Sequence, residues 1–381
     1  MLNMNPALEE LRWKKIPLLN DGFVCLVDAM GEDSSVVQAA KISYGKDVRE
    51  PEVILCDNCR GSGYVDPDIP PPISILCRVC NGSGRICNPD WTGQPDKDRT
   101  LLRYLMRNRH TTPFEMCELK FLIRIPMDAW RQMIRHRTAS VNEYSTRYTE
   151  AINSQQTTLP GEWRLQSGSN KQGSSGLLEE WPDGWHTEPN MDGDPETGLP
   201  DSCNVIYESK DGGLKIHEHQ AGPWNLTPGE YLSEKEEDFQ AHANNVYNRR
   251  LALGIAREQA RKDLPLSTYT EAYWKIDLHN LFHFLGLRMD SHAQLEIRLY
   301  ANAIGSIAEQ LFPMCWEAFK DYRLDAMSLS RLDILAAQEL KAVPSICLDA
   351  DTVDVCLTIA GFTNKREKDE CIAKMKRLRI L

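Results

Sequence analysis

The sequence lacks several features that would assign it to a common class of protein. It has no run of 18 or more apolar residues, so we expect no membrane-spanning helix. Its 55 acidic residues outnumber 44 basic ones and give a net charge of −11, which argues against general nucleic-acid binding. The acidic balance does not exclude a small phosphorylated ligand, because a few arginines can form a local positive pocket.

Two common nucleotide-binding motifs are also missing. The chain contains neither a G-x-G-x-x-G sequence nor a P-loop, so a nucleotide cofactor would have to bind outside a Rossmann crevice. The first residues, MLNMNPALEELRWKK, lack the apolar core of a signal peptide, and we expect a cytoplasmic protein. In that reducing compartment the 12 cysteines are not expected to form a disulfide framework.

Apolar periodicity predicts both strands and helices. FVCLVDAM is typical of a strand, and alternation from Leu119 to Ile125 predicts another, with a helix starting at Pro126. A long helix is expected from about 235 to 263, ended by Pro265. Apolar residues at helical spacing from Ala293 to Leu311 predict an amphipathic helix, which Asp290 or Ser291 could cap.

Changes in composition divide the chain. Residues 51–95, rich in Gly, Pro and Cys, and residues 176–222, rich in Gly, Ser, Asp and Pro, interrupt the ordered pattern. We expect one main domain formed by 1–50 and 96–322, a cysteine-rich insertion at 51–95 and a surface insertion at 176–222. Residues 323–381 are expected to form a helical C-terminal extension.

The most informative stretch is a dense polar run that follows the helix starting at Pro126. It reads RHRTASVNEYSTR from Arg135 to Arg147, and Gln132 lies on the polar face of the preceding helix. Guanidinium groups bind phosphate through two parallel hydrogen bonds, and hydroxyl and amide groups add directional ones. On composition alone, a solvated polar loop would explain this run about as well as a binding site does.

The order of these residues resembles the signature of the flavin-dependent thymidylate synthase (ThyX) family. That signature has Arg-His-Arg, seven residues and then Ser, with Asn-Glu and a final Arg nearby, and every position is filled here. Three further segments resemble the family in the expected order: HTTPFE from His110, REQARKDLP from Arg257 and LRMDSHAQ from Leu287. The resemblance covers about residues 16–50, 96–175 and 235–322.

The resemblance implies a fold and a set of ligands. The expected fold is α+β, with a mostly antiparallel central sheet flanked by helices. The family methylates dUMP, with FAD bound, NADPH as reductant and methylenetetrahydrofolate as carbon donor. Family members are homotetramers whose active sites draw residues from more than one subunit, and the same assembly is expected here.

The resemblance also implies a role for individual residues. Those expected to hold FAD are His110, Thr112, Glu115, Arg135, His136, Arg137, Glu143, Asn280 and His283. Those expected to hold dUMP are Gln132, Glu143, Ser145, Arg147, Arg261 and Arg288. Arg288 and Ser145 are the expected catalytic pair: Arg288 would stabilise negative charge on the uracil, and Ser145 would hold the ligand rather than act as a nucleophile.

Two of these assignments have plainer alternatives. Arg257 and Arg261 are one helical turn apart and could be ordinary exposed arginines. His279 and His283, at i and i+4, could suggest metal ligands, although no carboxylate motif accompanies them.

A second motif lies in the cysteine-rich insertion. Two copies of C-x-x-C-x-G-x-G begin at Cys56 and Cys77, so Cys56, Cys59, Cys77 and Cys80 can provide four thiolates for one structural zinc ion. The motif resembles the cysteine-rich repeats of DnaJ-type chaperones over about thirty residues only, and Cys87 is left as a non-ligand.

Two alternatives to the synthase reading stay open. The same residues would serve a relative that delivers hydroxymethyl rather than methyl to dUMP. The chain could also be a non-enzymatic, zinc-based binding module whose flavin site has decayed.

Overall fold

The structure is a computed structural model, and it describes residues 6–43, 45, 53–55, 85–87, 95–168, 173–189, 202–209, 215–221, 226–344 and 348–381. The chain divides into two compact units, Met1–Glu317 and Ala318–Leu381. The four cysteines of the predicted zinc site, Cys56, Cys59, Cys77 and Cys80, lie outside the described residues.

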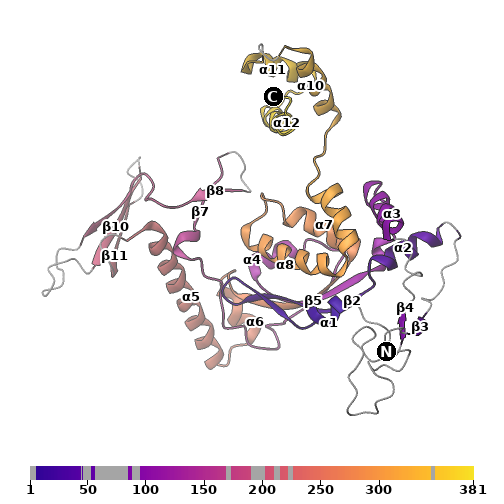
Figure 1. Ribbon diagram of the computed structural model, residues 1–381. Coiled ribbons are helices and arrows are strands. Elements are labelled where there is room, and N and C mark those ends of the chain that lie inside the picture. Colours follow the sequence, from indigo (N-terminus) through magenta and orange to yellow (C-terminus); the bar gives the residue numbers. More distant parts are fainter. Residues whose placement is uncertain are drawn as a thin grey trace, which may run out of the picture. The chain divides into compact units, whose positions relative to one another are not determined.

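The first unit is built on a five-stranded sheet with strand order β1-β2-β5-β12-β6 (Figure 1). Its strands are β1 (Lys15–Leu18), β2 (Gly22–Met30), β5 (Glu118–Pro126), β12 (Tyr269–Asp277) and β6 (Ser140–Glu143). All neighbouring strands pair antiparallel. The expected antiparallel central sheet is therefore confirmed.

Large apolar side chains fix the register of the central strands. Phe121 on β5 lies opposite Leu26 on one side and Trp274 on the other, and all three are fully buried. Burial of side chains of this size contributes roughly 1.5–3 kcal/mol each. The helices α4 (Met127–Met133), α7 (Leu278–Arg288) and α8 (Leu295–Leu311) pack on this sheet (Figure 1).

The starts of α7 and α8 differ in how they are capped. Oδ1 of Asp277 accepts a hydrogen bond from the backbone N–H of Asn280 at 2.9 Å and so caps α7. The predicted cap of α8 is wrong, because this helix begins at Leu295 with Gln294 as its N-cap residue. Asp290 instead accepts a hydrogen bond from the N–H of His292 at 2.8 Å, which closes the turn before the helix.

The long helix expected at about 235–263 is present, but both of its ends lie earlier in the chain. α5 runs from Pro228 to Ala252, because Thr227 and Glu230 form a capping box ahead of the predicted start. Gly254 has a φ of +76°, a left-handed conformation that suits glycine and ends the helix. The short helix α6 (Arg257–Ala260) and a 3₁₀ turn (Arg261–Asp263) follow before the strand β12.

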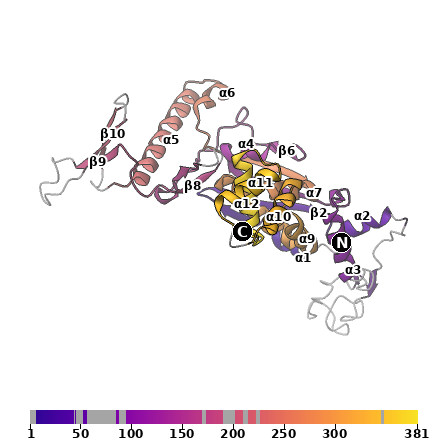
Figure 2. The ribbon, with the colours of Figure 1, turned by 90° about the horizontal axis from the view of Figure 1, so that it is seen from above.

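A smaller sheet lies beside the N-terminal end of α5. β9 (Trp185–Pro189), β10 (Ser202–Glu208) and β11 (Lys215–Ala221) form it, and Cys203 and Val205 pack with Tyr231 of α5. Figure 2 shows α5 running from this sheet toward α6. The remaining elements of this unit are α1 (Pro6–Leu11), α2 (Asp33–Ile42), β3 (Val53–Leu55), β4 (Arg85–Cys87), α3 (Pro95–Arg107), 3₁₀ turns at Phe114–Met116 and Pro160–Glu162, β7 (Arg164–Gln166) and β8 (Ser174–Leu177).

The chain passes from the first unit to the second within α9 (Pro313–Phe319), which a π-helical turn (Lys320–Leu324) follows. The described part of the second unit includes the helices α10 (Arg331–Ala342), α11 (Ala350–Ile359) and α12 (Lys365–Arg377). Their buried residues include Leu340, Leu357 and Met375, which form a separate apolar core. Among the residues that the structure describes, no helix has the length and apolar character needed to cross a membrane.

Candidate active site

A cavity of about 700 Å³ opens beside the end of β6 and the start of β12. Four basic side chains line it: Arg131, Arg147, Arg261 and Lys262. Its lining also includes the hydroxyl-bearing side chains of Ser145, Thr146, Thr268, Tyr269 and Thr270, and the carboxylates of Glu143 and Glu258. This donor set suits an anionic ligand that also carries hydroxyl or carbonyl groups.

The sheet holds Glu143 in place at one side of the cavity. Glu143 lies opposite Ala272 in the β6–β12 pairing, and the next residue, Tyr144, donates its N–H to the carbonyl oxygen of Glu271 at 2.8 Å. The hydroxyl of Thr270, a buried residue, donates to Oε1 of Glu143 at 2.9 Å. The carboxylate of Glu143 is therefore fixed by a hydrogen bond on one oxygen.

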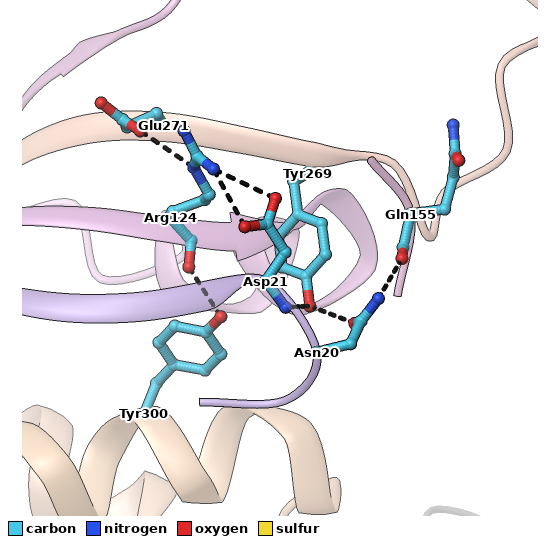
Figure 3. A network of polar contacts seen from close by, with 7 residues as sticks. All are labelled: Asn20, Asp21, Arg124, Gln155, Tyr269, Glu271 and Tyr300. Carbon is cyan, nitrogen blue, oxygen red and sulfur yellow. Dashed lines mark hydrogen bonds and ion pairs between the residues drawn. The ribbon is translucent and has the colours of Figure 1, made fainter. Parts of the chain in front are cut away.

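A polar network on the neighbouring strands fixes the start of β12. Arg124 donates to both carboxylate oxygens of Asp21, at 3.1 and 3.0 Å, and from Nε to Glu271 at 3.0 Å (Figure 3). The hydroxyl of Tyr269 donates to Oδ1 of Asn20 at 2.8 Å. Because Tyr269 also lines the cavity, this network anchors part of the cavity wall.

The arginines of the cavity approach from two segments. Arg261 donates to the hydroxyl of Thr146, and Nε of Arg147 lies 3.4 Å from Oε2 of Glu258. Both members of the Arg147–Glu258 ion pair are exposed, so the pair itself adds little stability. Arg147 and Arg261 therefore both present positive charge to the cavity.

Ser145 also lines the cavity and is half-buried. Within the part of the chain that the structure describes, its hydroxyl has no side-chain partner that could act as a base. This arrangement suits a hydroxyl that holds a ligand better than an activated nucleophile, and the role of Ser145 stays a prediction.

A second cluster of predicted residues forms where α4 and α7 end. Nε of Arg288 donates to Nε2 of His136 at 3.2 Å, and Nη2 donates to the backbone oxygen of Gln132 at 3.5 Å. The His136 ring packs edge-on against Phe284 at 5.0 Å and against His283 at 5.8 Å between ring centroids. Gln132, His136, His283 and Arg288 therefore meet in one place.

The electrostatics of this cluster keep His136 neutral. Burial, then the nearby charges of Arg288 and His283, lower the pKa of His136 to about 4. Burial and the charge of Arg135 also lower the pKa of Arg288. Two guanidinium groups beside a neutral imidazole suit an uncharged or anionic ring system that carries carbonyl groups, such as a flavin.

Three more predicted residues lie on the loop between α3 and β5. His110 is exposed, with its ring 5.6 Å from that of Tyr104, and Glu115 donates its N–H to the carbonyl oxygen of Thr112 at 3.2 Å. Phe114 of this loop is buried against Phe282 of α7, with ring centroids 6.5 Å apart. The loop therefore packs on the helix that carries His283 and Arg288.

Within a single chain, the predicted site residues fall into two groups, and only one of them lines the cavity. The cavity contains Glu143, Ser145, Arg147 and Arg261, whereas Gln132, Arg135, His136, Arg137 and Arg288 do not line it. Nδ2 of Asn280 donates to Oδ2 of Asp277 at 2.6 Å, so its amide nitrogen supports the cap of α7. Among the described residues, no group of three His, Cys, Asp or Glu side chains could hold a metal, and His279 and His283 gain no third ligand there.

The cavity also contains residues that the sequence reading missed. Lys262 and Glu258 lie in the segment that carries Arg261, so their nearness in sequence was a usable signal. Thr270 was not identifiable, because a single threonine in a strand looks like any other β-branched residue.

Comparison with known proteins places these observations in a family. Residues 25–314 match the family described as "Thymidylate synthase complementing protein" (Thy1). The chain belongs to this family. It is 37% identical over 326 residues to a flavin-dependent thymidylate synthase from Rickettsia typhi, covering 86% of this chain and 85% of that protein. It is 33% identical over 333 residues to one from Wolbachia pipientis wMel, covering 87% and 86%.

A comparison with solved structures also finds a similar fold. The chain is similar to the crystal structure of a UMP/dUMP methylase PolB from Streptomyces cacaoi bound with 5-Br dUMP, with a TM-score of 0.50 and 26% identity. The match covers 81% of this chain and 99% of that one.

Proposed function

We propose that this Thy1-family protein is a flavin-dependent thymidylate synthase that converts dUMP to dTMP. Methylenetetrahydrofolate would be the carbon donor and NADPH the reductant. The observation that carries the proposal is the cavity in which Arg147 and Arg261 lie beside Ser145 and the fixed carboxylate of Glu143. A nucleoside monophosphate supplies the phosphate, hydroxyl and carbonyl groups that these side chains can bind.

Each part of the chain would have a distinct task. Arg147 and Arg261 bind the phosphate of dUMP, and binding displaces Glu258 from Arg147. The neutral imidazole of His136 holds Arg288, whose guanidinium stabilises negative charge on the uracil carbonyl edge. FAD, when bound, supplies the redox chemistry of the methyl transfer. Its expected contacts are the loop from His110 to Glu115, Arg135 to Arg137, and His283.

In a homotetramer, the cavity residues of one copy and the Arg288 cluster of another could form a single site. Gln132, His136 and Arg288 lie outside the cavity of their own chain. A second copy that brings this cluster to the cavity would complete a site for both dUMP and flavin. The edge strand β6 pairs with β12 on one side only within the described sheet, and its residues are exposed.

We also propose one structural zinc in the insertion at 51–95, held by Cys56, Cys59, Cys77 and Cys80. Four thiolates close a tetrahedral site and leave no position for activated water. Metal analysis should find about one zinc per chain, and Cys59→Ser should lower it while flavin remains bound. Metal-free protein in which all four thiols react freely would rule the site out.

The test of the main proposal is the product itself. The FAD-loaded protein is incubated with dUMP, methylenetetrahydrofolate and NADPH, with controls that omit the folate or NADPH, and the nucleotide is analysed by mass spectrometry. The expected product is dTMP. A product with one additional oxygen would identify the hydroxymethylating alternative. A protein that takes up no FAD and leaves dUMP unchanged would favour the binding module.

A further inference from the structure

Three side chains form a hydrogen-bonded relay that links α4 to the segment before α8. Nε2 of Gln132 donates to Oε1 of Gln294, and Nε2 of Gln294 donates to Oδ2 of Asp128 at 2.8 Å. Asp128 and Gln132 lie one turn apart on α4, whereas Gln294 comes from a segment 162 residues beyond Gln132. All three side chains are only half-exposed.

The chemistry of the relay sets the direction of every hydrogen bond in it. A carboxylate only accepts, so Gln294 must turn its amide nitrogen toward Asp128. The amide oxygen of Gln294 then faces Gln132, and because this oxygen also only accepts, Gln132 must present its own nitrogen. The amide of Gln132 is thereby locked in one of its two orientations, although either would fit the space.

This lock leaves one group of Gln132 available. Within the described part of the chain, Oε1 of Gln132 has no hydrogen-bond donor. Gln132 belongs to the cluster of Arg288, whose Nη2 donates to its backbone oxygen at 3.5 Å, and in the proposed tetramer this cluster meets the cavity of a second copy. An acceptor held in a fixed direction favours a ligand that presents a donor there, and it disfavours one that presents an acceptor.

We propose that Asp128 and Gln294 are positioning residues that lock Gln132, so that its Oε1 accepts a hydrogen bond from the bound nucleotide. The donor is either the ring N–H of the pyrimidine or a hydroxyl of the sugar. The inference rests on the proposed function, since it names how that same site selects its nucleotide. A relay without the carboxylate would let the amide of Gln132 flip and turn its nitrogen toward the donor.

The relay can be tested by removing the carboxylate at position 128 and then introducing one at position 294. In Asp128→Asn the side chain keeps its shape but can donate as well as accept, so the lock is lost. We expect the Kd of dUMP for the FAD-loaded enzyme, followed by the flavin absorbance change, to rise about tenfold. In the double variant Asp128→Asn/Gln294→Glu, the new carboxylate accepts from both neighbours and restores the lock. Its Kd should return to within about threefold of the unmodified enzyme.

Two nucleotide analogues identify the donor. If it is the ring N–H, Asp128→Asn should weaken dUMP binding and strengthen binding of dCMP, whose ring nitrogen is an acceptor. If it is the sugar hydroxyl, the dideoxy analogue of dUMP should bind equally to both enzymes. Asp238→Asn, at an exposed position on α5, is the matched control and should leave all three affinities unchanged.

Some results would overturn the relay. These are unchanged dUMP affinity in Asp128→Asn, or an equal loss in the single and double variants with the same melting temperature. A uniform loss for all three nucleotides would do the same, because it would show only a structural role. Failure of the proposed function is distinct, since the unmodified enzyme would then not bind or convert dUMP.

Discussion

Nε of Arg288 donates a hydrogen bond to Nε2 of His136 at 3.2 Å, and the two residues are 152 positions apart in the chain. The contact joins the last residue of α7 to the turn that follows α4. A ring nitrogen that accepts this bond carries no proton, which agrees with a pKa of His136 lowered to about 4. His136 therefore holds the guanidinium in one plane.

Replacement of Arg288 by lysine separates charge from geometry. Lysine keeps the positive charge but loses the planar fork that contacts both His136 and the backbone of Gln132. We expect kcat to fall by roughly 100-fold in Arg288→Lys, with FAD still bound. Steady-state kinetics and flavin absorbance would check this, and near-normal turnover would show that Arg288 does not activate the uracil.

The neutral state of His136 predicts how stability changes with pH. Its pKa is about 6.5 in an unfolded chain and about 4 here, so between these values the unfolded chain binds more protons. The stability that neutral His136 provides is fully present above pH 6.5 and is lost as the pH falls through 4.

Thermal unfolding at several pH values would measure this effect. His136→Gln should flatten the dependence between pH 6.5 and 4, whereas His242→Gln, at an exposed position on α5, should not. If His136→Gln and the unmodified chain showed the same slope, His136 would titrate alike in both states.

Much of the fold could be predicted from the sequence, because burial leaves a local pattern. The alternation in ELKFLIRI marked β5, and FVCLVDAM marked β2, since half or more of their side chains enter the core. The two ends of α5 were predicted less accurately. The helix starts at the capping box of Thr227 and ends at the left-handed Gly254, whereas the prediction relied on apolar spacing and on Pro265 as the helix end.

The candidate site was predictable in its residue types but not in its contacts. The order of polar residues from Arg135 to Arg147 pointed to the signature by resemblance. No local pattern indicated that Thr270 contacts Glu143 or that Gln294 contacts Gln132, because those pairs are 127 and 162 residues apart. Such pairings come from tertiary packing, which brings distant segments together.

Thr270 gives a test of how firmly Glu143 must be held. Thr270→Val keeps the β-branched shape in the strand but removes the hydroxyl that donates to Glu143. We expect kcat/KM for dUMP to fall about tenfold, since one hydrogen bond to a charged group is lost. Thr270→Ser keeps the hydroxyl and should retain most of the activity, although serine suits a strand less well. If activity followed melting temperature rather than the hydroxyl, Thr270 would act on stability alone.

In the second unit an ion pair between a partly exposed lysine and a buried carboxylate joins two helices. Nζ of Lys374 on α12 lies 2.7 Å from Oδ2 of Asp333, whose side chain is only 2% exposed and also caps α10 with Ser330. Burial alone would raise the pKa of Asp333, but hydrogen bonds from Lys374 and Ser330 outweigh it and lower the pKa to about 2. The stability that this carboxylate provides is therefore present above pH 4 and lost as the pH falls through 2.

Removal of one partner should cost more than removal of both. Lys374→Met leaves a buried carboxylate unpaired and should destabilise the unit by about 2 kcal/mol, whereas Lys374→Met/Asp333→Asn should recover part of that loss. Hydrogen exchange of α10 and α12 amides in the full chain reports on this unit directly. Glu370→Gln, which breaks the exposed Arg366–Glu370 pair on α12, is the matched control and should change exchange little. Equal exchange in Lys374→Met and the control would mean that Lys374 does not stabilise Asp333, and the capping bonds from Ser330 would then account for its low pKa.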